Sequence, residues 1–299
     1  MLKVEHVTKY YDKFRAVHDV SFEIHEGEIF GLLGVNGAGK TTTFRMIMGL
    51  LDKNEGSITL DGKEIDYSVT DKIGFLTEER SLLPTKTVLE QAVYYGVLKG
   101  MTPVEVGDRL DEYLKEFGIE EYKNKKIKEL SKGNQQKIQF ILSVLHKPRL
   151  LILDEPFSGL DPINVEMFKK VILKLKREKT IIIFSSHMLE HVEYFCDSLI
   201  ILVKGEAVLS GKLTKIKEDY RRKNIKIIAD IKEDELKKIK GVVRVEKNKD
   251  EYTVRIEDIS YVKDVFKALS KCNNVTKFVV EEPTLNEIFI DKVGESYEK

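Results

Sequence analysis

Residues 34–41 read Gly34-Val35-Asn36-Gly37-Ala38-Gly39-Lys40-Thr41 and match the pattern G-x-x-x-x-G-K-[ST] in full. Glycines allow a tight turn in which successive backbone N–H groups converge on phosphate oxygens, and the helix that follows adds the positive end of its dipole. The Lys40 ammonium supplies a point charge for the β- and γ-phosphates, and the Thr41 hydroxyl can ligate Mg²⁺. The pattern predicts a phosphate-binding loop made of Gly34, Asn36, Gly37, Ala38, Gly39, Lys40, Thr41 and Thr42.

A second motif supplies carboxylates for the same site. Residues 150–155 read Leu-Leu-Ile-Leu-Asp-Glu, an apolar strand that ends in Asp154 and Glu155. We expect Asp154 at the strand tip to join the Mg²⁺ shell, and Glu155 to face the attacking water as a base or a water-positioning group. An apolar run that ends in Asp-Glu is common, so the prediction depends on the phosphate loop more than a hundred residues earlier.

Composition restricts the class of protein. Of the 299 residues, 42% are apolar and 33% are charged, which excludes a disordered or collagen-like chain. Fifty basic residues balance fifty acidic ones, so no overall charge draws the chain to nucleic acid or an anionic membrane. Apolar runs such as 150–153 are too short to cross a bilayer, and Cys196 and Cys272 are far apart and indicate free thiols. We expect a soluble, cytoplasmic protein that reaches a membrane only through a partner.

Periodicity predicts two domains, an α/β domain over 1–211 and a smaller α+β domain over 224–299, joined by a linker helix over 212–223. In the first, residues 3–8 alternate as in an edge strand, and residues 81–146 hold apolar side chains at helical spacing. Buried strands separated by a helix indicate a parallel core sheet. The second domain is expected to be ferredoxin-like from the order strand 225–231, helix 233–239, strand 242–246, strand 252–256, helix 260–269, strand 275–280, with a last helix over 284–293.

Three further motifs complete an ordered set. Residues 130–136 read Leu-Ser-Lys-Gly-Asn-Gln-Gln, residues 158–161 read Ser-Gly-Leu-Asp, and His187 follows the next apolar strand. With the two motifs above, this order resembles the nucleotide-binding subunit of ATP-binding cassette (ABC) transporters over residues 1 to about 211. Glu-Glu-Arg at 78–80 and the ending Pro-Thr-Leu-Asn-Glu-Ile-Phe at 283–289 resemble bacterial exporter ATPases of the sodium-efflux and YhaQ type. The implied fold is a P-loop NTPase cassette with a parallel core sheet, an antiparallel β subdomain and a helical subdomain.

The resemblance implies roles for further residues. Tyr11 stands where the family stacks an aromatic ring on adenine, although the neighbouring Tyr10 leaves the register open. Ser131 and Gly133 would face the γ-phosphate of ATP bound to the other protomer, where a helix N-terminus again offers N–H groups. Asp161 would lie at the dimer seam, and His187 would contact the γ-phosphate and support Glu155.

Two positions depart from the family pattern. Glu78 replaces the usual glutamine, so it can still offer an oxygen to Mg²⁺ or water but adds negative charge beside the triphosphate. In the signature stretch, Lys132 replaces the first glycine and Asn134 replaces the glutamine, while the serine hydroxyl and the second glycine remain. We therefore expect phosphate sensing to survive.

These observations predict an ATP- and Mg²⁺-dependent ATPase subunit of an exporter. It would act as a homodimer or with a paired ATPase subunit, at the inner face of the cell membrane, through separate integral membrane permease subunits and without nucleic acid. A non-transport ABC ATPase and a nucleotide-sensing regulatory protein are the alternatives; intact Glu155 argues against the second. The small domain lacks the paired aromatic residues of an RNA-binding sheet, so dimerisation or regulation is the expected role.

Overall fold

The computed structural model describes residues 1–79 and 81–297. The chain forms two compact units, Met1–Gly211 and Lys212–Lys299. Both contain a sheet that is covered by helices, and each has its own buried core.

A six-stranded sheet is the centre of the first unit. Its strand order is β10-β9-β3-β8-β7-β6, and the five strands from β9 to β6 pair in parallel. The central strands are buried along nearly their whole length, because both faces of the sheet are covered. One face shares a core with the antiparallel sheet, and the other packs on side chains such as Phe195. The bounds are β3 (Ile29–Gly34), β6 (Ile73–Leu76), β7 (Leu150–Asp154), β8 (Ile181–Ser185), β9 (Ser198–Val203) and β10 (Glu206–Lys212).

An antiparallel sheet of order β2-β1-β4-β5 forms the second layer of this unit. Residues 3–8 were expected at an edge, but β1 is longer and lies inside the sheet, paired with β2 on one side and β4 on the other. The edge prediction was wrong because alternation reports one buried face and says nothing about the number of neighbouring strands. The bounds are β1 (Leu2–Tyr11), β2 (Phe14–Ile24), β4 (Glu55–Leu60) and β5 (Lys63–Glu64).

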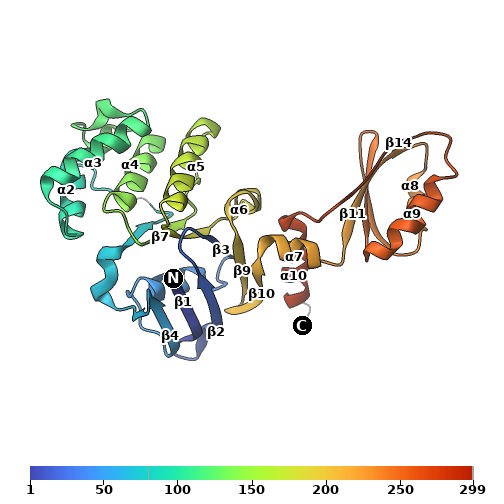
Figure 1. The fold of residues 1–299 in the computed structure, drawn as a ribbon, viewed down its shortest axis with the longest axis horizontal. Coiled ribbons are helices and arrows are strands. Elements are labelled where there is room, and N and C mark those ends of the chain that lie inside the picture. Colours follow the sequence, from blue (N-terminus) through green and yellow to red (C-terminus); the bar gives the residue numbers. More distant parts are fainter. Residues whose placement is uncertain (80, 298–299) are drawn as a thin grey trace. The chain divides into compact units, whose positions relative to one another are not determined.

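The helical part of the first unit is rich in N-terminal caps. Thr87 and Thr102 each form a capping box with a glutamate three residues later, and Ser131 caps α4. Figure 1 shows α2, α3 and α4 together, apart from the strands of the antiparallel sheet. The bounds are α1 (Lys40–Ile47), α2 (Val88–Leu98), α3 (Pro103–Glu116), α4 (Lys132–Val144), α5 (Pro162–Arg177) and α6 (Leu189–Phe195), with 3₁₀ turns Tyr67–Lys72, Glu120–Tyr122 and Ile127–Glu129.

The second unit has the ferredoxin-like fold that its element order predicts. Its antiparallel sheet has the order β12-β13-β11-β14, so the first and third strands lie at the centre. Side chains such as Ile227, Val254 and Val265 form its core, whereas Phe266, an apolar residue of the expected helix 260–269, is exposed. The bounds are α7 (Leu213–Asp219), β11 (Lys223–Ala229), α8 (Glu233–Lys237), β12 (Val242–Asn248), β13 (Glu251–Ile256), a 3₁₀ turn Ile259–Tyr261, α9 (Val262–Leu269), β14 (Val275–Glu281) and α10 (Leu285–Tyr297).

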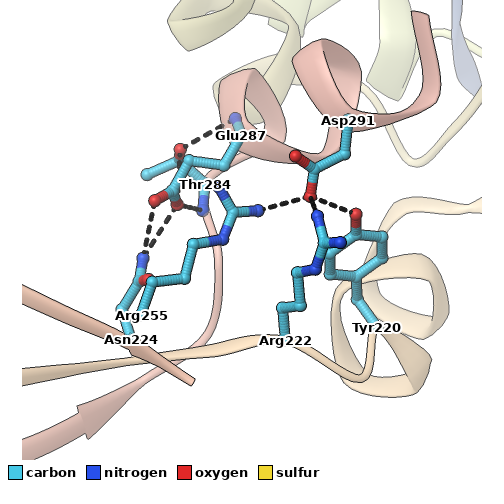
Figure 2. Close-up of polar contacts among 7 residues, drawn as sticks. All are labelled: Tyr220, Arg222, Asn224, Arg255, Thr284, Glu287 and Asp291. Carbon is cyan, nitrogen blue, oxygen red and sulfur yellow. Dashed lines mark hydrogen bonds and ion pairs between the residues drawn. The ribbon is translucent and has the colours of Figure 1, made fainter. Parts of the chain in front are cut away.

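A polar cluster holds α10 against the rest of the second unit (Figure 2). Oδ2 of Asp291 accepts hydrogen bonds from the Tyr220 hydroxyl at 2.6 Å, Arg222 Nη1 at 2.7 Å and Arg255 Nη2 at 2.6 Å. Burial acts to raise the pKa of Asp291, but the bonds from Tyr220 and Arg222 and the charge of Arg255 outweigh it, so the pKa lies below its ordinary value. The carboxylate therefore stays ionised and joins the connector before β11, strand β13 and the last helix.

We expect Asp291→Asn to loosen α10. The change removes the carboxylate that Arg222 and Arg255 share, and Arg255 is nearly buried, so we expect a cost of about 2 kcal/mol. Hydrogen–deuterium exchange of the full chain should show the α10 amides exchanging about 30-fold faster, because local opening then costs less. Asp250→Asn, in an exposed turn, is the matched control. Equal protection of α10 in both variants would contradict a stabilising role for the cluster.

Candidate functional site

The loop between β3 and α1 has the backbone that phosphate binding requires. Gly37 and Gly39 have φ angles of 78° and 102°, in the region that favours glycine. A Cβ on Gly39 would lie 2.6 Å from the carbonyl oxygen of Ala16, so β2 approaches the loop too closely for any side chain there. The loop ends at the first turn of α1, whose free N–H groups point toward it.

Lys40, Thr41 and Thr43 differ in their contacts at the start of α1. The Lys40 ammonium lies across the loop and donates to the carbonyl oxygens of Gly34 at 2.7 Å and Val35 at 3.3 Å. Thr43 donates to the Gly39 carbonyl inside its helix, whereas Thr41 is exposed at the helix start. Thr41 is therefore the one of these hydroxyls best placed for a cation.

Three carboxylates act electrostatically on the Lys40 ammonium. Burial lowers the pKa of Lys40, while the charges of Asp154, Glu155 and Glu78 act in the opposite direction. This electrostatic coupling places Glu78, which replaces the family's glutamine, in the field of the same ammonium. The negative charges of these three carboxylates therefore favour the charged form of Lys40 and oppose the effect of its burial.

Glu155 and His187 form a pair beside this loop. Nδ1 of His187 lies 2.8 Å from Oε2 of Glu155, and the side chain of Glu155 is 12% exposed while that of His187 is 71% exposed. Burial raises the pKa of Glu155, and the charge and hydrogen bond of His187 oppose that shift. An ionised carboxylate can only accept, so Nδ1 carries the proton when Glu155 is charged.

The signature residues gather at a second place. Ser131 caps α4 by accepting from the Asn134 amide at 3.3 Å, and Gly133 lies in the first turn of that helix. Asp161 caps α5 and binds both the amide and the side chain of Asn164, at 2.9 and 2.5 Å. A Cβ on Gly133 would lie 3.6 Å from Nδ2 of Asn164, so the two helix starts are neighbours. Ser131 and Asp161 are exposed.

Tyr11 lies at the end of β1, where it pairs with Phe14 across a tight hairpin. Its side chain is exposed, and the Lys9 ammonium lies 5.8 Å from its ring centroid. Phe14 is more exposed than Tyr10 or Tyr11. The sequence did not single it out as a candidate for stacking on a base. The structure thus offers three aromatic rings at this hairpin, Tyr10, Tyr11 and Phe14.

Two buried residues that support the site carry no motif and were also missed. Gln139 of α4 donates through Nε2 to the carbonyl oxygens of Thr77 and Glu79, so it ties the signature helix to the segment that holds Glu78. Ser185 at the end of β8 donates to Oδ1 of Asp154 at 2.5 Å. Sequence offers one signal for Ser185, its position at the end of a buried strand just before His187.

The donor set fits a nucleotide with Mg²⁺. In the described parts of the chain, no three His, Cys, Asp or Glu side chains form a metal cluster by themselves. Mg²⁺ is usually held by one or two protein oxygens together with substrate phosphates and water, and an exposed Thr41 hydroxyl plus Asp154 satisfies that preference. The glycine loop, with positive φ at Gly37 and Gly39, has a backbone suited to directing N–H groups at phosphates.

Comparison with known proteins identifies the family. Residues 17–158 match the ABC transporter family, and residues 211–293 match the C-terminal domain of DrrA1-3-like ATP-binding proteins. The chain is 48% identical over 298 residues to the uncharacterized ABC transporter ATP-binding protein YhaQ of Bacillus subtilis (strain 168), with 100% of both chains covered. The chain belongs to the ABC transporter ATP-binding proteins.

The chain is also similar to more distant members of the ABC family. The linearmycin resistance ATP-binding protein LnrL of Bacillus subtilis (strain 168) is 32% identical, with 98% of both chains covered. A dimeric structure of the ATP-binding cassette MJ0796, described as a post-hydrolysis state bound to ADP and Pi, superimposes with a TM-score of 0.65 at 27% identity, covering 71% of this chain and 99% of that one. Cassettes of this family are ATPases, and the present ABC subunit is a nucleotide-binding ATPase, as its motifs predict.

We expect Lys40→Ala to weaken nucleotide binding by about 10- to 100-fold. The change deletes the cation that faces the phosphates, and hydrogen bonds to charged groups contribute about 1.5–3 kcal/mol. Titration with a fluorescent ATP analogue measures the affinity. Lys263→Ala, an exposed lysine of the second unit, should bind as the unaltered chain does. Unchanged affinity in Lys40→Ala would count against the loop as the phosphate site.

Proposed function

We propose that this ABC subunit binds ATP with Mg²⁺ in the loop 34–41 and hydrolyses it with Glu155 as the base, as one of two ATPase subunits that power an exporter. The observation that carries the proposal is the Glu155–His187 pair, which lies beside the Lys40 ammonium at the same edge of the sheet. Half-burial of Glu155 favours its neutral form and so strengthens it as a proton acceptor.

Each side chain has one task in this proposal. Glu155 takes the proton of the attacking water, and His187 keeps the carboxylate oriented through Nδ1. Lys40 and the loop N–H groups bind the phosphates and neutralise their charge. Thr41 and Asp154 would hold Mg²⁺, which supplies charge neutralisation between the phosphates when bound. Glu78, from the segment that follows β6, would offer a further oxygen to the cation or to its water.

A second subunit completes the site in this proposal. Ser131 and Gly133 open the helix α4, and Asp161 opens the adjoining α5, on an exposed part of the first unit. Two neighbouring helix starts form a surface that favours anions. Such a surface suits the outer face of a γ-phosphate that is bound to the partner's loop. The dimeric cassette among the solved structures supports this arrangement.

The permease would dock beside the Glu78 segment. A cavity of about 240 Å³ lies between the end of α1, β6, α2 and α4, with mainly apolar lining that includes Leu50, Phe75, Leu82, Tyr95 and Leu142. Leu50 is exposed at its rim, and Tyr94, Val97 and Leu98 are exposed on α2. An apolar hollow with an apolar rim fits a partner helix. The described residues include no helix that is long and apolar enough to span a membrane.

A relative of this chain supports export as the direction of transport. This relative, LnrL, is named a linearmycin resistance ATP-binding protein, and it matches this chain along nearly its full length. That likeness supports outward transport by the complex. The ATPase subunit would then lie at the cytoplasmic side of the membrane, attached through the permease.

We expect Glu155→Gln to bind ATP normally but to lose most hydrolysis, about 100-fold or more, because an amide cannot accept the water's proton. The variant should also accumulate as an ATP-bound dimer, which size-exclusion chromatography with and without ATP detects. Glu178→Gln, at the exposed end of α5, is the control and should hydrolyse ATP at the normal rate. Normal turnover in Glu155→Gln would remove Glu155 from the catalytic role.

We expect Leu50→Asp to separate the ATPase from its permease, because a carboxylate at the rim of the cavity must be desolvated on docking. The affinity-tagged full chain is purified from native membranes, and co-purifying membrane proteins are identified by mass spectrometry. Leu50→Asp should recover several-fold less permease, while Ile259→Asp in the second unit should recover the normal amount. Equal recovery in both variants would place the permease contact elsewhere.

A further inference from the structure

Ser185 is the last residue of β8 and lies directly opposite Asp154, the last residue of β7. The two strands pair in parallel, and the register from Leu150 opposite Ile181 to Asp154 opposite Ser185 is unbroken. The side chain of Ser185 is fully buried. A buried hydroxyl needs hydrogen-bond partners, and the Ser185 hydroxyl has one on Asp154 and one on Glu155.

The single hydroxyl serves two residues at once. The hydroxyl donates a hydrogen bond to Oδ1 of Asp154, 2.5 Å away, because an ionised carboxylate can only accept. A lone pair on the same oxygen accepts the backbone N–H of Glu155 at 3.3 Å, and the Ser185 carbonyl oxygen lies 3.2 Å from that nitrogen. Ser185 therefore contacts the side chain of one carboxylate residue and the backbone of the next.

The backbone at Glu155 requires such support. Its φ angle is 49°, in the left-handed region that residues with a side chain seldom adopt. This turn directs the Glu155 carboxylate to His187 instead of continuing along the strand. The N–H that is shared between two Ser185 oxygens holds the turn in place.

The neighbouring serine has a different task. The Ser186 hydroxyl accepts from the Met188 amide at 3.0 Å and so shapes the loop around His187. Of the two consecutive serines, the structure connects only Ser185 with Asp154 and Glu155 in the part of the chain it describes.

We propose that Ser185 is a positioning residue for hydrolysis: its hydroxyl fixes Oδ1 of Asp154, leaves Oδ2 to face the cation, and holds the Glu155 backbone in the turn that aims the base. The inference rests on the proposed roles of Asp154 and Glu155. It assigns the serine no contact with substrate. Its action is the orientation of two carboxylates that would otherwise be free to rotate or straighten.

The test compares Ser185→Ala with the unaltered full chain. Loss of a hydrogen bond to a charged group should lower kcat about 10- to 100-fold. ATP affinity in EDTA should stay within about twofold, because the phosphate loop is unchanged. The gain in affinity that Mg²⁺ gives should shrink, because Asp154 is no longer fixed. Ser185→Thr keeps the hydroxyl and should restore most of kcat and of the Mg²⁺ effect.

Ser143→Ala is the matched control, since Ser143 is a buried serine whose hydroxyl donates to the Phe140 carbonyl of its own helix. Glu155→Gln is measured beside both. If Ser185→Ala turns over within about threefold of normal while Glu155→Gln is inactive, the positioning role is overturned and the proposed function stands. Active Glu155→Gln would instead overturn the proposed function. The positioning role would also be rejected if Ser185→Ala lowered the ATP affinity in EDTA and the thermal midpoint together with kcat. It would be rejected as well if Ser185→Thr folded but restored neither kcat nor the Mg²⁺ effect.

Discussion

Parallel pairing of β3, β8 and β7 is the constraint on which the site depends. Parallel strands that are hydrogen-bonded neighbours end at one edge of the sheet, so whatever follows each strand meets there. The phosphate loop follows β3, Asp154 and Glu155 follow β7, and Ser185 and His187 follow β8. The pairing of the strands thus brings together residues that are more than a hundred positions apart in the sequence.

The Lys40 ammonium at that edge is held in place by its own loop. Three carboxylates act on Lys40, and its partial burial makes their influence larger than it would be in water. The ammonium meanwhile bonds to loop carbonyl oxygens, so its position is set before any phosphate arrives. Preorganised charge of this kind costs little reorganisation when a ligand binds.

The two helices α4 and α10 show the same principle in different units. Gln139 on α4 holds the segment before Glu79 through two carbonyl oxygens, and Asp291 on α10 holds three donors from two other elements. In each case a buried or half-buried polar side chain joins elements that apolar packing alone would leave free to slide. Hydrogen bonds of this kind fix how the elements pack, because breaking one leaves a buried polar group without that partner.

The sequence by itself determined the family, the ATPase activity, the fold of both units and the motifs that contain the expected site residues. Local patterns sufficed for these conclusions, because glycine spacing, apolar strands and the order of elements are written in neighbouring residues. Only the tertiary structure decided that β1 lies inside its sheet, that Phe266 is exposed, and that Ser185, Gln139 and Asp291 hold other residues in place. A buried serine or glutamine looks ordinary in a sequence because its importance comes from its partners, and register between strands 30 residues apart decides who those partners are.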